Sequence, residues 1–442
     1  MRVAVVGQGH VGLTGAVALA QHGHRVVGVE KDATRLMLLR AGEPTVVETG
    51  LAEQMAAVFR AGRLQFTDCL EEAVAADPVD AVLICVGTPP SRDGGPDLTQ
   101  VYQVFEEAAG LDGNPLIVLK STVPPGTTDA LLAARPDLRD RFVCNPDFLV
   151  QGTALDDWRA PTRTVVGSRS PHALERLRTL YAWSSSSWVT TSPSSAEMVK
   201  YASNAFLAMR ISYANELARL CGDPDLDVDA VITGVGLDPR IGRALPGPGP
   251  GFGDSDLAKD TLALAVWARA RAIDTPLLDA AIEIDVRQTG TIMELVRTGA
   301  GGRLSGLSVA VLGLRHEPWS DDLRAAPSRA LIPLLHEHEA DVRVWDPAMT
   351  PEELRSLAPR ALPCTALVPA VTGAHAVVVL TPWPQLAEAD WDDLATRMKA
   401  PRLLVDARNH LPTRLLARWP GVYRSVGNRH PAPQVSEPEP TS

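Results

Sequence analysis

A glycine-rich hexapeptide near the start of this 442-residue chain constrains its fold more than any other feature: Gly7-Gln8-Gly9-His10-Val11-Gly12. It lies between an apolar strand expected over residues 1–7 and a stretch with helical apolar spacing over 12–22. A second apolar strand is expected over 25–30. The order strand, helix, strand is the βαβ unit of a parallel sheet, and the three glycines permit a tight turn, close approach of a bound group, and close helix–strand packing.

The same hexapeptide predicts a dinucleotide site, because free N–H groups and the helix dipole at the N-terminus of the following helix favour a pyrophosphate. Glu30 ends the second strand, where a carboxylate accepts a hydrogen bond from a ribose 2′-hydroxyl and repels a 2′-phosphate. NAD is therefore favoured over NADP, although Lys31 beside Glu30 argues for NADP. A glycine turn without a ligand is the alternative. The expected cofactor contacts are Gly7, Gly9, His10, Val11, Gly12 and Glu30.

Apolar strands and helical stretches divide the rest of the chain into regions. In the first region, further buried strands are expected over 81–86, 116–120, 142–144 and 164–167. A helix is then expected over 195–221, which Ser194 or Ser195 would cap. A Gly/Pro-rich loop over 246–253 precedes a second helical stretch over 257–298. In the last region, strands alternating with helices are expected over 307–312, 342–345, 376–380 and 403–405.

These regions predict an α/β protein with two Rossmann-like doubly wound domains, joined by a long central helix and a helical middle domain. The expected domains are an NAD-binding domain over 1–193, a helical central domain over 194–300, a C-terminal α/β domain over 301–430 and a disordered tail over 431–442.

Composition excludes several other classes of protein. The formal net charge is −11 and no Lys/Arg run stands out, which argues against a nucleic-acid surface. The five cysteines are scattered and form no C-x-x-C pair, so neither a disulfide framework nor a metal site is expected. The chain begins directly with a strand pattern, and its apolar runs are too short to span a bilayer, so we expect a cytoplasmic protein with no membrane partner.

The remaining motifs resemble the UDP-glucose/GDP-mannose dehydrogenase family over nearly the whole chain. The resemblance implies an NAD-binding domain, a helical dimerising middle and a C-terminal domain that holds a GDP- or UDP-linked sugar, and hence a homodimer. The motifs that carry it include Glu48-Thr49-Gly50-Leu51, Val86-Gly87-Thr88-Pro89, Lys120-Ser121-Thr122-Val123-Pro124-Pro125-Gly126-Thr127, Asn145-Pro146-Asp147-Phe148-Leu149, Asn204-Ala205-Phe206-Leu207-Ala208, Asp238-Pro239-Arg240-Ile241-Gly242, Trp345-Asp346-Pro347 and Asp406-Ala407-Arg408-Asn409.

Three segments depart from the family pattern. Family members oxidise a primary sugar alcohol twice, and a cysteine traps the intermediate aldehyde before water releases the acid. At the position of that cysteine this chain has Asp256, and a carboxylate is a far weaker nucleophile than a thiolate. Asp147 and Gln151 stand where the family has two glutamates, and a glutamine cannot act as a general base for water. The family's Ala-Phe-Lys is Arg315-His316-Glu317, so Arg315 is a candidate to replace the lysine near the diphosphate.

Other expected site residues match family positions. Lys200 and Asn204 lie four residues apart, hence on one face of the expected helix. The resemblance assigns catalytic positions to Thr122, Asp147, Gln151, Lys200, Asn204, Asp256 and Asp260. It assigns further cofactor contacts to Val86, Gly87, Thr88, Ser121, Thr122 and Lys259. It assigns substrate contacts to Phe148, Leu149, Lys200, Asn204, Arg240, Phe252, Gly253, Arg315 and Arg408.

Loss of the cysteine suggests an enzyme that stops after one oxidation, which suits a secondary alcohol that gives a ketone. The resulting ketone acidifies the neighbouring C–H, so a β-hydroxyl can leave and the hydride can be returned. The main hypothesis is therefore a redox-neutral dehydratase, such as a GDP-octose 6,8-dehydratase of lincosamide antibiotic biosynthesis. Asp256 would be the acid, and Lys200 with Asp147 or Asp260 the base.

Three alternatives remain open at the level of the sequence. The first is a one-step nucleotide-sugar dehydrogenase that releases a keto-sugar and NADH. The second is an epimerase that oxidises, inverts and reduces. The third is a catalytically silent nucleotide-sugar-binding partner of an active dehydrogenase.

Overall fold

The computed structural model describes residues 1–75, 77–222, 225–242, 246–253, 255–318 and 323–428. These residues form two compact units. The first unit comprises Met1–Asn204 and Leu262–Asp274. The second comprises Ala205–Thr261, Thr275–Pro318 and residues 323–428. The tail expected over 431–442 lies outside the described residues.

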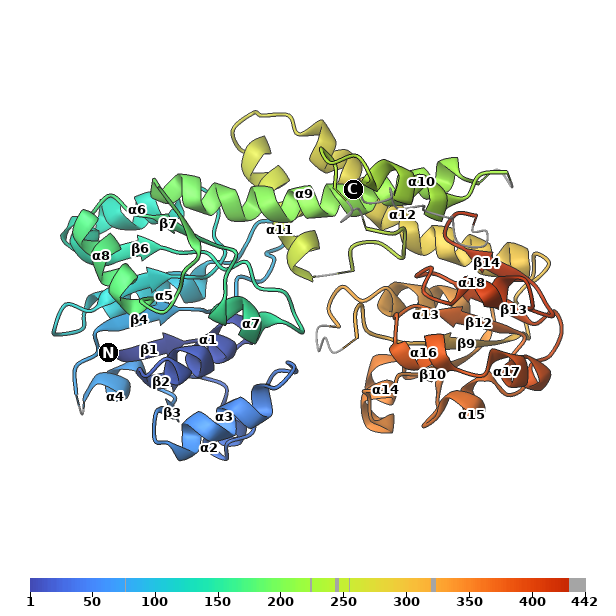
Figure 1. The fold of residues 1–442 in the computed structure, drawn as a ribbon, viewed down its shortest axis with the longest axis horizontal. Helices are drawn as coiled ribbons and strands as arrows, with labels where there is room; N and C mark the ends of the chain where they lie inside the picture. Colours follow the sequence, from blue (N-terminus) through green and yellow to red (C-terminus); the bar gives the residue numbers. More distant parts are fainter. Residues whose placement is uncertain (76, 223–224, 243–245, 254, 319–322, 429–442) are drawn as a thin grey trace, which may run out of the picture. The chain divides into compact units, whose positions relative to one another are not determined.

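The first unit is built on an eight-stranded sheet in the order β3-β2-β1-β4-β5-β6-β7-β8 (Figure 1). β1 lies between β2 and β4 and runs parallel to both, with Val3 opposite Val26 on one side and Ala81 on the other. The strands are β1 (Arg2–Val6), β2 (Arg25–Val29), β3 (Leu64–Thr67), β4 (Ala81–Ile84), β5 (Leu116–Leu119), β6 (Phe142–Cys144), β7 (Arg163–Gly167) and β8 (Ser187–Thr191).

Alternate residues of β1 face two separate cores, as the period of two along a strand requires. Val3 and Val5 pack with α1, α2, α3, α7 and α8, whereas Ala4 and Val6 pack with α4, α5, α6 and η1. These helices are α1 (His10–Gln21), α2 (Ala33–Arg40), α3 (Leu51–Arg60), α4 (Leu70–Ala75), α5 (Thr99–Ala109), α6 (Thr127–Ala134), the 3-10 helix η1 (Pro136–Arg141), α7 (Ala154–Arg159) and α8 (Pro171–Leu180). Helices on both faces make this a doubly wound sheet.

The last two strands of this sheet run against the others. Cys144 of β6 pairs with Gly167 of β7 in antiparallel register, and β8 is parallel to β7. Gly167 also allows the chain to approach closely, because a Cβ atom there would lie 2.6 Å from Cα of Pro193. The end of β7 is therefore in direct contact with the start of the long helix that follows.

The long helix is α9 (Pro193–Leu220). The expected cap at Ser194 or Ser195 is wrong, because the helix begins at Pro193, a residue whose fixed φ suits a first helical position. Ser192 precedes the helix, and its Oγ accepts a hydrogen bond from Ser195 N at 3.3 Å. Glu197 fixes the first turns to α6, because its carboxylate accepts hydrogen bonds from Gly126 N and Thr128 N, each at 2.7 Å.

The second unit contains a six-stranded, all-parallel sheet in the order β11-β10-β9-β12-β13-β14 (Figure 1). Its strands are β9 (Ser308–Leu312), β10 (Asp341–Trp345), β11 (Leu362–Pro363), β12 (Ala376–Val379), β13 (Leu403–Asp406) and β14 (Tyr423–Ser425). Its remaining helices are α10 (Val228–Gly236), α13 (Ser328–Glu337), α14 (Pro351–Leu357), α15 (Leu367–Val371), α16 (Pro384–Glu388), α17 (Trp391–Arg397) and α18 (Thr413–Leu416).

The helical stretch expected over 257–298 is two helices, α11 (Ser255–Arg269) and α12 (Pro276–Gly299). The break falls where Ala272 adopts φ +56°, and Pro276 then occupies the first turn of α12. The fold class predicted from the sequence is otherwise confirmed, with two Rossmann-like sheets and a helical middle region. Among the described residues, no helix combines the length and apolar character needed to cross a membrane.

Candidate active site

The glycine hexapeptide forms the turn between β1 and α1. Gly7 has φ +89°, and a Cβ atom on Gly12 would lie 1.8 Å from the Gly7 carbonyl oxygen, so neither position accepts another residue without a shift of the backbone. A Cβ atom on Gly9, in contrast, would meet nothing within 4 Å. The space beside Gly9 lies at the N-terminus of α1, where unpaired N–H groups favour a pyrophosphate. This local geometry fits a bound dinucleotide.

Glu30, the residue expected to contact the ribose, directly follows β2, which ends at Val29 and so one residue earlier than expected. Its carboxylate accepts hydrogen bonds from Gln8 N at 3.3 Å and Asp32 N at 3.0 Å, and these hold it beside the glycine turn. Lys31, the residue that argued for NADP, lies 3.1 Å from Glu107 through its Nζ atom. Its charge is therefore balanced by a carboxylate on α5.

The other expected cofactor residues of the first unit follow β4 and β5. Val86, Gly87 and Thr88 come after β4, and Ser121 and Thr122 come after β5. Ser121 joins the two segments, because its Oγ donates to the Val86 carbonyl oxygen at 2.7 Å. Since carboxyl ends of parallel strands meet at one edge of a sheet, these residues and the glycine turn share the edge at which the strand order reverses.

A buried ion pair lies at the same edge, beyond β6. Lys200 Nζ of α9 is 3.2 Å from Asp147 Oδ2, and the two side chains expose only 8% and 11% of their surface. Burial raises the pKa of Asp147, but the ammonium groups of Lys200 and Lys120 outweigh that effect and hold the pKa below its ordinary value. Asn204 lies one turn further along α9 and is also buried. The pair therefore presents a carboxylate and an ammonium group side by side.

Lys120 is a second buried lysine at this site. Its Nζ donates to Asn145 Oδ1 at 3.1 Å and lies 4.7 Å from the centre of the Trp158 ring. Burial lowers its pKa. With Asn145, Asp147 and Phe148, it lines a cavity of about 70 Å³. Leu149 and Gln151 follow Phe148 in the segment that leads into α7.

Asp256, Lys259 and Asp260 lie in the first two turns of α11, in the second unit. Lys259 Nζ forms a short ion pair with Asp260 and lies 3.8 Å from Asp256 Oδ1. Asp260 is fully buried, whereas the side chain of Asp256 exposes 57% of its surface. The position at which the resemblance expects a nucleophile therefore carries an exposed carboxylate beside a lysine.

The loop that precedes α11 is held by Asp285 of α12. Asp285 Oδ1 accepts a hydrogen bond from Phe252 N at 2.7 Å, and burial raises the pKa of Asp285 to about 6. Gly251 permits this contact, because a Cβ atom there would lie 2.3 Å from the same carboxylate oxygen. Gly253 is similarly close to the ring of His316.

The arginines expected to contact substrate have different surroundings. Arg408 is mostly buried, donates through Nε to the Leu380 carbonyl oxygen at 2.8 Å, and pairs with Glu317 at 3.2 Å. Arg315 is buried and donates to the Ala348 carbonyl oxygen at 3.0 Å, with Asp346 at 3.9 Å. Arg240 exposes 87% of its side chain and pairs with Asp238 at 2.6 Å. Of these three arginines, Arg408 is the one whose guanidinium group contacts His316 and Glu317.

The five cysteines all lie within the described residues, and burial raises the pKa of four of them: Cys85, Cys144, Cys221 and Cys364. The pKa of Cys85 rises to about 12, so only about one molecule in 10⁵ carries the thiolate there at pH 7. Cys69 follows β3, which is an edge strand of the sheet and is separated from β6 by four other strands. The site near Lys200 therefore has no activated thiol among these residues.

Three family models match the chain in order along its length. The UDP-glucose/GDP-mannose dehydrogenase family's NAD binding domain matches residues 1–184, its central domain 194–287, and its UDP binding domain 310–413. The chain belongs to the UDP-glucose/GDP-mannose dehydrogenase family. Its glycine turn is accordingly part of an NAD-binding domain. The protein is an NAD-dependent nucleotide-sugar oxidoreductase of this family.

Individual members of the family are similar over almost their full length. UDP-glucose 6-dehydrogenase from Rhizobium meliloti (strain 1021) is 38% identical, with 97% of this chain and 99% of that protein covered. The enzyme of that name from Pseudomonas aeruginosa is 37% identical, with 97% of each chain covered. The structure of a UDP-glucose dehydrogenase from Pyrobaculum islandicum superposes with a TM-score of 0.86 at 35% identity, with 96% of this chain and 97% of that chain covered.

Sequence reasoning gave no role to Glu48, Lys120 or Asp285, although each holds a segment that carries expected site residues. Glu48 accepts from Gly152 N, Lys120 donates to Asn145 Oδ1, and Asp285 accepts from Phe252 N. Glu48 and Lys120 lie inside motifs that resemble the family. A charged residue close to a glycine, or at the end of an apolar strand, is the sequence signal that could have indicated a role for them. Asp285 gave no signal, because its partner Phe252 lies 33 residues away and the contact exists only in the folded chain.

Two glycine substitutions form a matched test of the NAD site. Gly12→Ala places a Cβ atom against the Gly7 carbonyl oxygen and should destabilise the first unit by about 2 kcal/mol or more. Gly9→Ala meets no protein atom and should leave stability unchanged, but should weaken NAD binding at least tenfold because its methyl group occupies the space for the pyrophosphate. Urea unfolding and calorimetric NAD titration measure the two effects. Equal NAD affinity in Gly9→Ala and the unsubstituted protein would contradict the assignment.

Asp285→Asn tests the raised pKa of Asp285. The folded protein resists ionisation of this carboxyl group, so its destabilising effect is absent near pH 3, grows as the pH rises through the unfolded pKa of about 3.9 and is complete above the folded pKa of about 6. The asparagine variant keeps an acceptor for Phe252 N but cannot ionise. It should exceed the unsubstituted protein in stability by about 3 kcal/mol at pH 8 and match it near pH 3, as measured by urea unfolding. A pH-independent difference would show that ionisation of Asp285 is not the cause.

Proposed function

We propose that this protein is an NAD-dependent nucleotide-sugar dehydrogenase that oxidises one sugar alcohol to a carbonyl compound and stops there. The observation that carries the proposal is the exposed Asp256 at the expected cysteine position, together with the absence of an activated thiol among the five described cysteines. Without a thiolate, an aldehyde is not trapped as a thiohemiacetal, so the second oxidation of the family's reaction has no covalent intermediate.

The residues of the first unit support the remaining first oxidation. When bound, NAD accepts the hydride from the carbinol carbon. We assign removal of the hydroxyl proton to the Asp147–Lys200 pair, whose carboxylate and ammonium group are 3.2 Å apart and shielded from solvent. Lys200 orients the hydroxyl oxygen, and Asn204, one turn along α9, supplies an amide to the same face. Thr122, next to the Ser121–Val86 contact, is placed at the cofactor edge of the sheet.

Gln151 strengthens this assignment. Water must be activated by a base to release an acid from a thioester, and an amide cannot accept that proton. Gln151 stands where the resemblance expects a glutamate, in the segment that begins with Phe148 and leads into α7. Both residues needed for the second half of the family's reaction, the cysteine and the glutamate, are therefore replaced, by Asp256 and Gln151. Lys200, Asn204 and Asp260 are retained.

The substrate's nucleotide is assigned to the C-terminal domain, which matches the family's UDP binding domain. Arg408 is the proposed diphosphate contact, since its buried fork lies beside the His316 and Glu317 segment. Phe252 and Gly253 precede α11 in the same unit and are proposed to contact the sugar. Arg315 contacts Asp346 and the Ala348 carbonyl oxygen. We therefore propose that Arg315 holds this segment in place and does not itself contact the diphosphate.

A redox-neutral dehydration of a longer sugar, such as a GDP-octose, is the second candidate. The carboxylate of Asp256 favours it, because a dehydratase needs an acid for the leaving hydroxyl and a plain dehydrogenase does not. The exposure of 57% of that side chain supports it less well, since an acid of this kind needs enclosed surroundings. We therefore place the one-step dehydrogenase first.

We also propose a homodimer formed by the central helices. Several large apolar side chains of the second unit are exposed on α9 and α12, namely Phe206, Leu207, Tyr213, Leu277 and Val286. A set of exposed apolar side chains on neighbouring elements is typical of a protein–protein interface. Sedimentation equilibrium measures the assembly, and a monomer at micromolar concentration would contradict it.

Mass spectrometry of the product tests the function. The protein is incubated with NAD and a panel of UDP- and GDP-linked sugars, including UDP-glucose. A product lighter by two hydrogens, formed with NADH, is the expected result. Loss of one water without net NADH supports the dehydratase, and an isomer of equal mass supports the epimerase. Formation of the sugar acid, or binding without any product, contradicts the proposal.

Substitutions at Asp256 and Gln151 test why the reaction stops. Asp256→Cys alone should form no UDP-glucuronic acid from UDP-glucose, because Gln151 still fails to activate water. Asp256→Cys combined with Gln151→Glu should form it at a measurable rate. Acid formation by the single variant would show that Gln151 does not block hydrolysis. Asp256→Asn, which leaves no carboxyl group, should retain at least half of the dehydrogenase rate; a loss of 10²-fold would favour the acid role of Asp256.

A further inference from the structure

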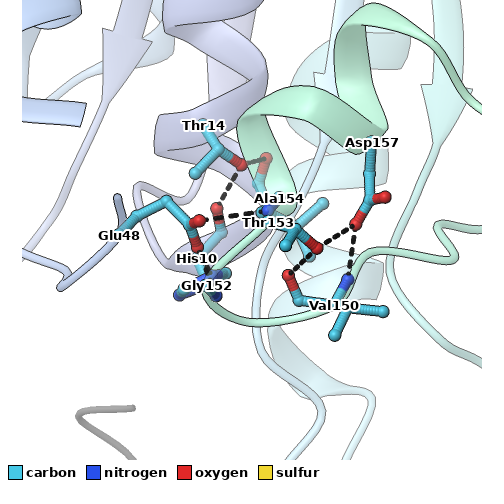
Figure 2. A network of polar contacts seen from close by, with 9 residues as sticks. His10, Thr14, Glu48, Val150, Gly152, Thr153, Ala154 and Asp157 are labelled. Atoms are coloured by element: carbon cyan, nitrogen blue, oxygen red, sulfur yellow. Dashed lines mark hydrogen bonds and ion pairs between the residues drawn. The ribbon is translucent and has the colours of Figure 1, made fainter. Parts of the chain in front are cut away.

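A buried carboxylate joins the glycine turn to the segment after Phe148. Glu48 lies between α2 and α3, and its side chain has no exposed surface. It accepts hydrogen bonds from His10 Nε2 at 2.8 Å, Gly152 N at 2.9 Å and Ala154 N at 3.1 Å (Figure 2). One side chain thus holds the first residue of α1 and the start of α7 together.

His10 is the end of this network nearest to the cofactor. It stands between Gly9 and Gly12 in the turn, and Thr14 Oγ1 donates to its carbonyl oxygen at 2.6 Å. Its second ring nitrogen, Nδ1, is buried and has no hydrogen-bond partner among the described residues. The hydrogen bonding of the ring is therefore incomplete in the protein alone, at the place where the pyrophosphate binds.

The other end of the network borders the reacting pair. Gly152 directly follows Gln151 and Ala154 lies two residues further on, in the segment that begins with Asp147 and Phe148. Helices α1 and α7 also touch, because a Cβ atom on Gly15 would lie 2.6 Å from the Trp158 ring. Short, direct contacts through Glu48 therefore connect His10 to this segment.

We propose that Glu48 is a positioning residue that couples NAD binding to the order of residues 150–154, with His10 as the link. NAD held at the N-terminus of α1 restrains His10, and the restrained imidazole keeps Glu48 in place to accept from Gly152 and Ala154. The cofactor thereby orders the segment that carries Gln151, directly after Phe148 and Leu149, before the sugar is bound. The role of that segment in substrate contact rests on the function proposed above, but the coupling itself does not.

Hydrogen exchange measured by mass spectrometry on peptides that cover 150–154 tests the coupling. In the unsubstituted protein, saturating NAD should slow exchange there at least about fivefold. His10→Phe keeps an aromatic ring but removes the donor to Glu48. With NAD raised to saturation for this variant, as calorimetry verifies, exchange in this segment should not slow. Glu48→Gln should raise exchange at 150–154 without NAD and abolish most of the NAD effect.

Asp157→Asn is the matched control. Asp157 holds the same segment from its other side, because its Oδ2 atom accepts from Val150 N at 2.9 Å and Thr153 Oγ1 at 3.3 Å (Figure 2). This variant should exchange faster at 150–154 but keep the NAD-dependent slowing. Equal slowing in His10→Phe and the unsubstituted protein, or no slowing in the unsubstituted protein while NAD binds, would overturn the proposal. Since no sugar turnover is needed, failure of the product assay leaves this result readable.

Discussion

The parallel pairing of β1 with β2 on one side and β4 on the other is the constraint on which the rest of the structure depends. It places the chain reversal at Gly7, where φ is +89° and only glycine is comfortable. It also sets the point at which the strand order reverses, because α1, which follows β1, and α5, which follows β4, pack on opposite faces of the sheet. The cofactor residues after β1, β2, β4 and β5 meet at this edge for that reason.

Electrostatics at the end of β6 then define the chemistry. Asp147 is buried, and a buried carboxylate is costly unless opposite charge compensates it. Lys200 and Lys120 supply that charge, and their effect exceeds the effect of burial on the pKa of Asp147. The same burial raises the pKa of the nearby thiols of Cys85 and Cys144. The surroundings therefore favour a charged carboxylate–ammonium pair and disfavour a thiolate.

Much of the fold could be predicted from local patterns, because apolar runs and the glycine turn act through neighbours in the sequence. The strands at the centres of both sheets and the start of the dinucleotide site follow from such patterns. The short edge strands β3, β8, β11 and β14 were missed, because they are brief and partly exposed and so lack a continuous apolar run. The cap of α9 was misplaced because Pro193 begins the helix one residue before the serines that seemed suited to cap it.

Several residues of the candidate site could be predicted from the sequence, but the contacts that hold their segments in place could not. Lys200, Asn204 and Asp147 were found through motif spacing and resemblance, and the structure brings Lys200 and Asp147 into contact. The three-way contact of Glu48 with His10, Gly152 and Ala154 depends on residues more than 100 positions apart, which no local pattern contains. Likewise, the raised pKa of Asp285 depends on burial that arises only when α12 covers the loop at Phe252.

The central claim is that replacement of the cysteine by Asp256, together with Gln151, leaves a single oxidation. It is tested most directly by the number of NADH molecules formed for each nucleotide sugar consumed, with absorbance at 340 nm and chromatography of the remaining sugar nucleotide read on the same sample. The account predicts one NADH for each sugar. Two NADH for each sugar would contradict it, because a second oxidation would then proceed without the cysteine.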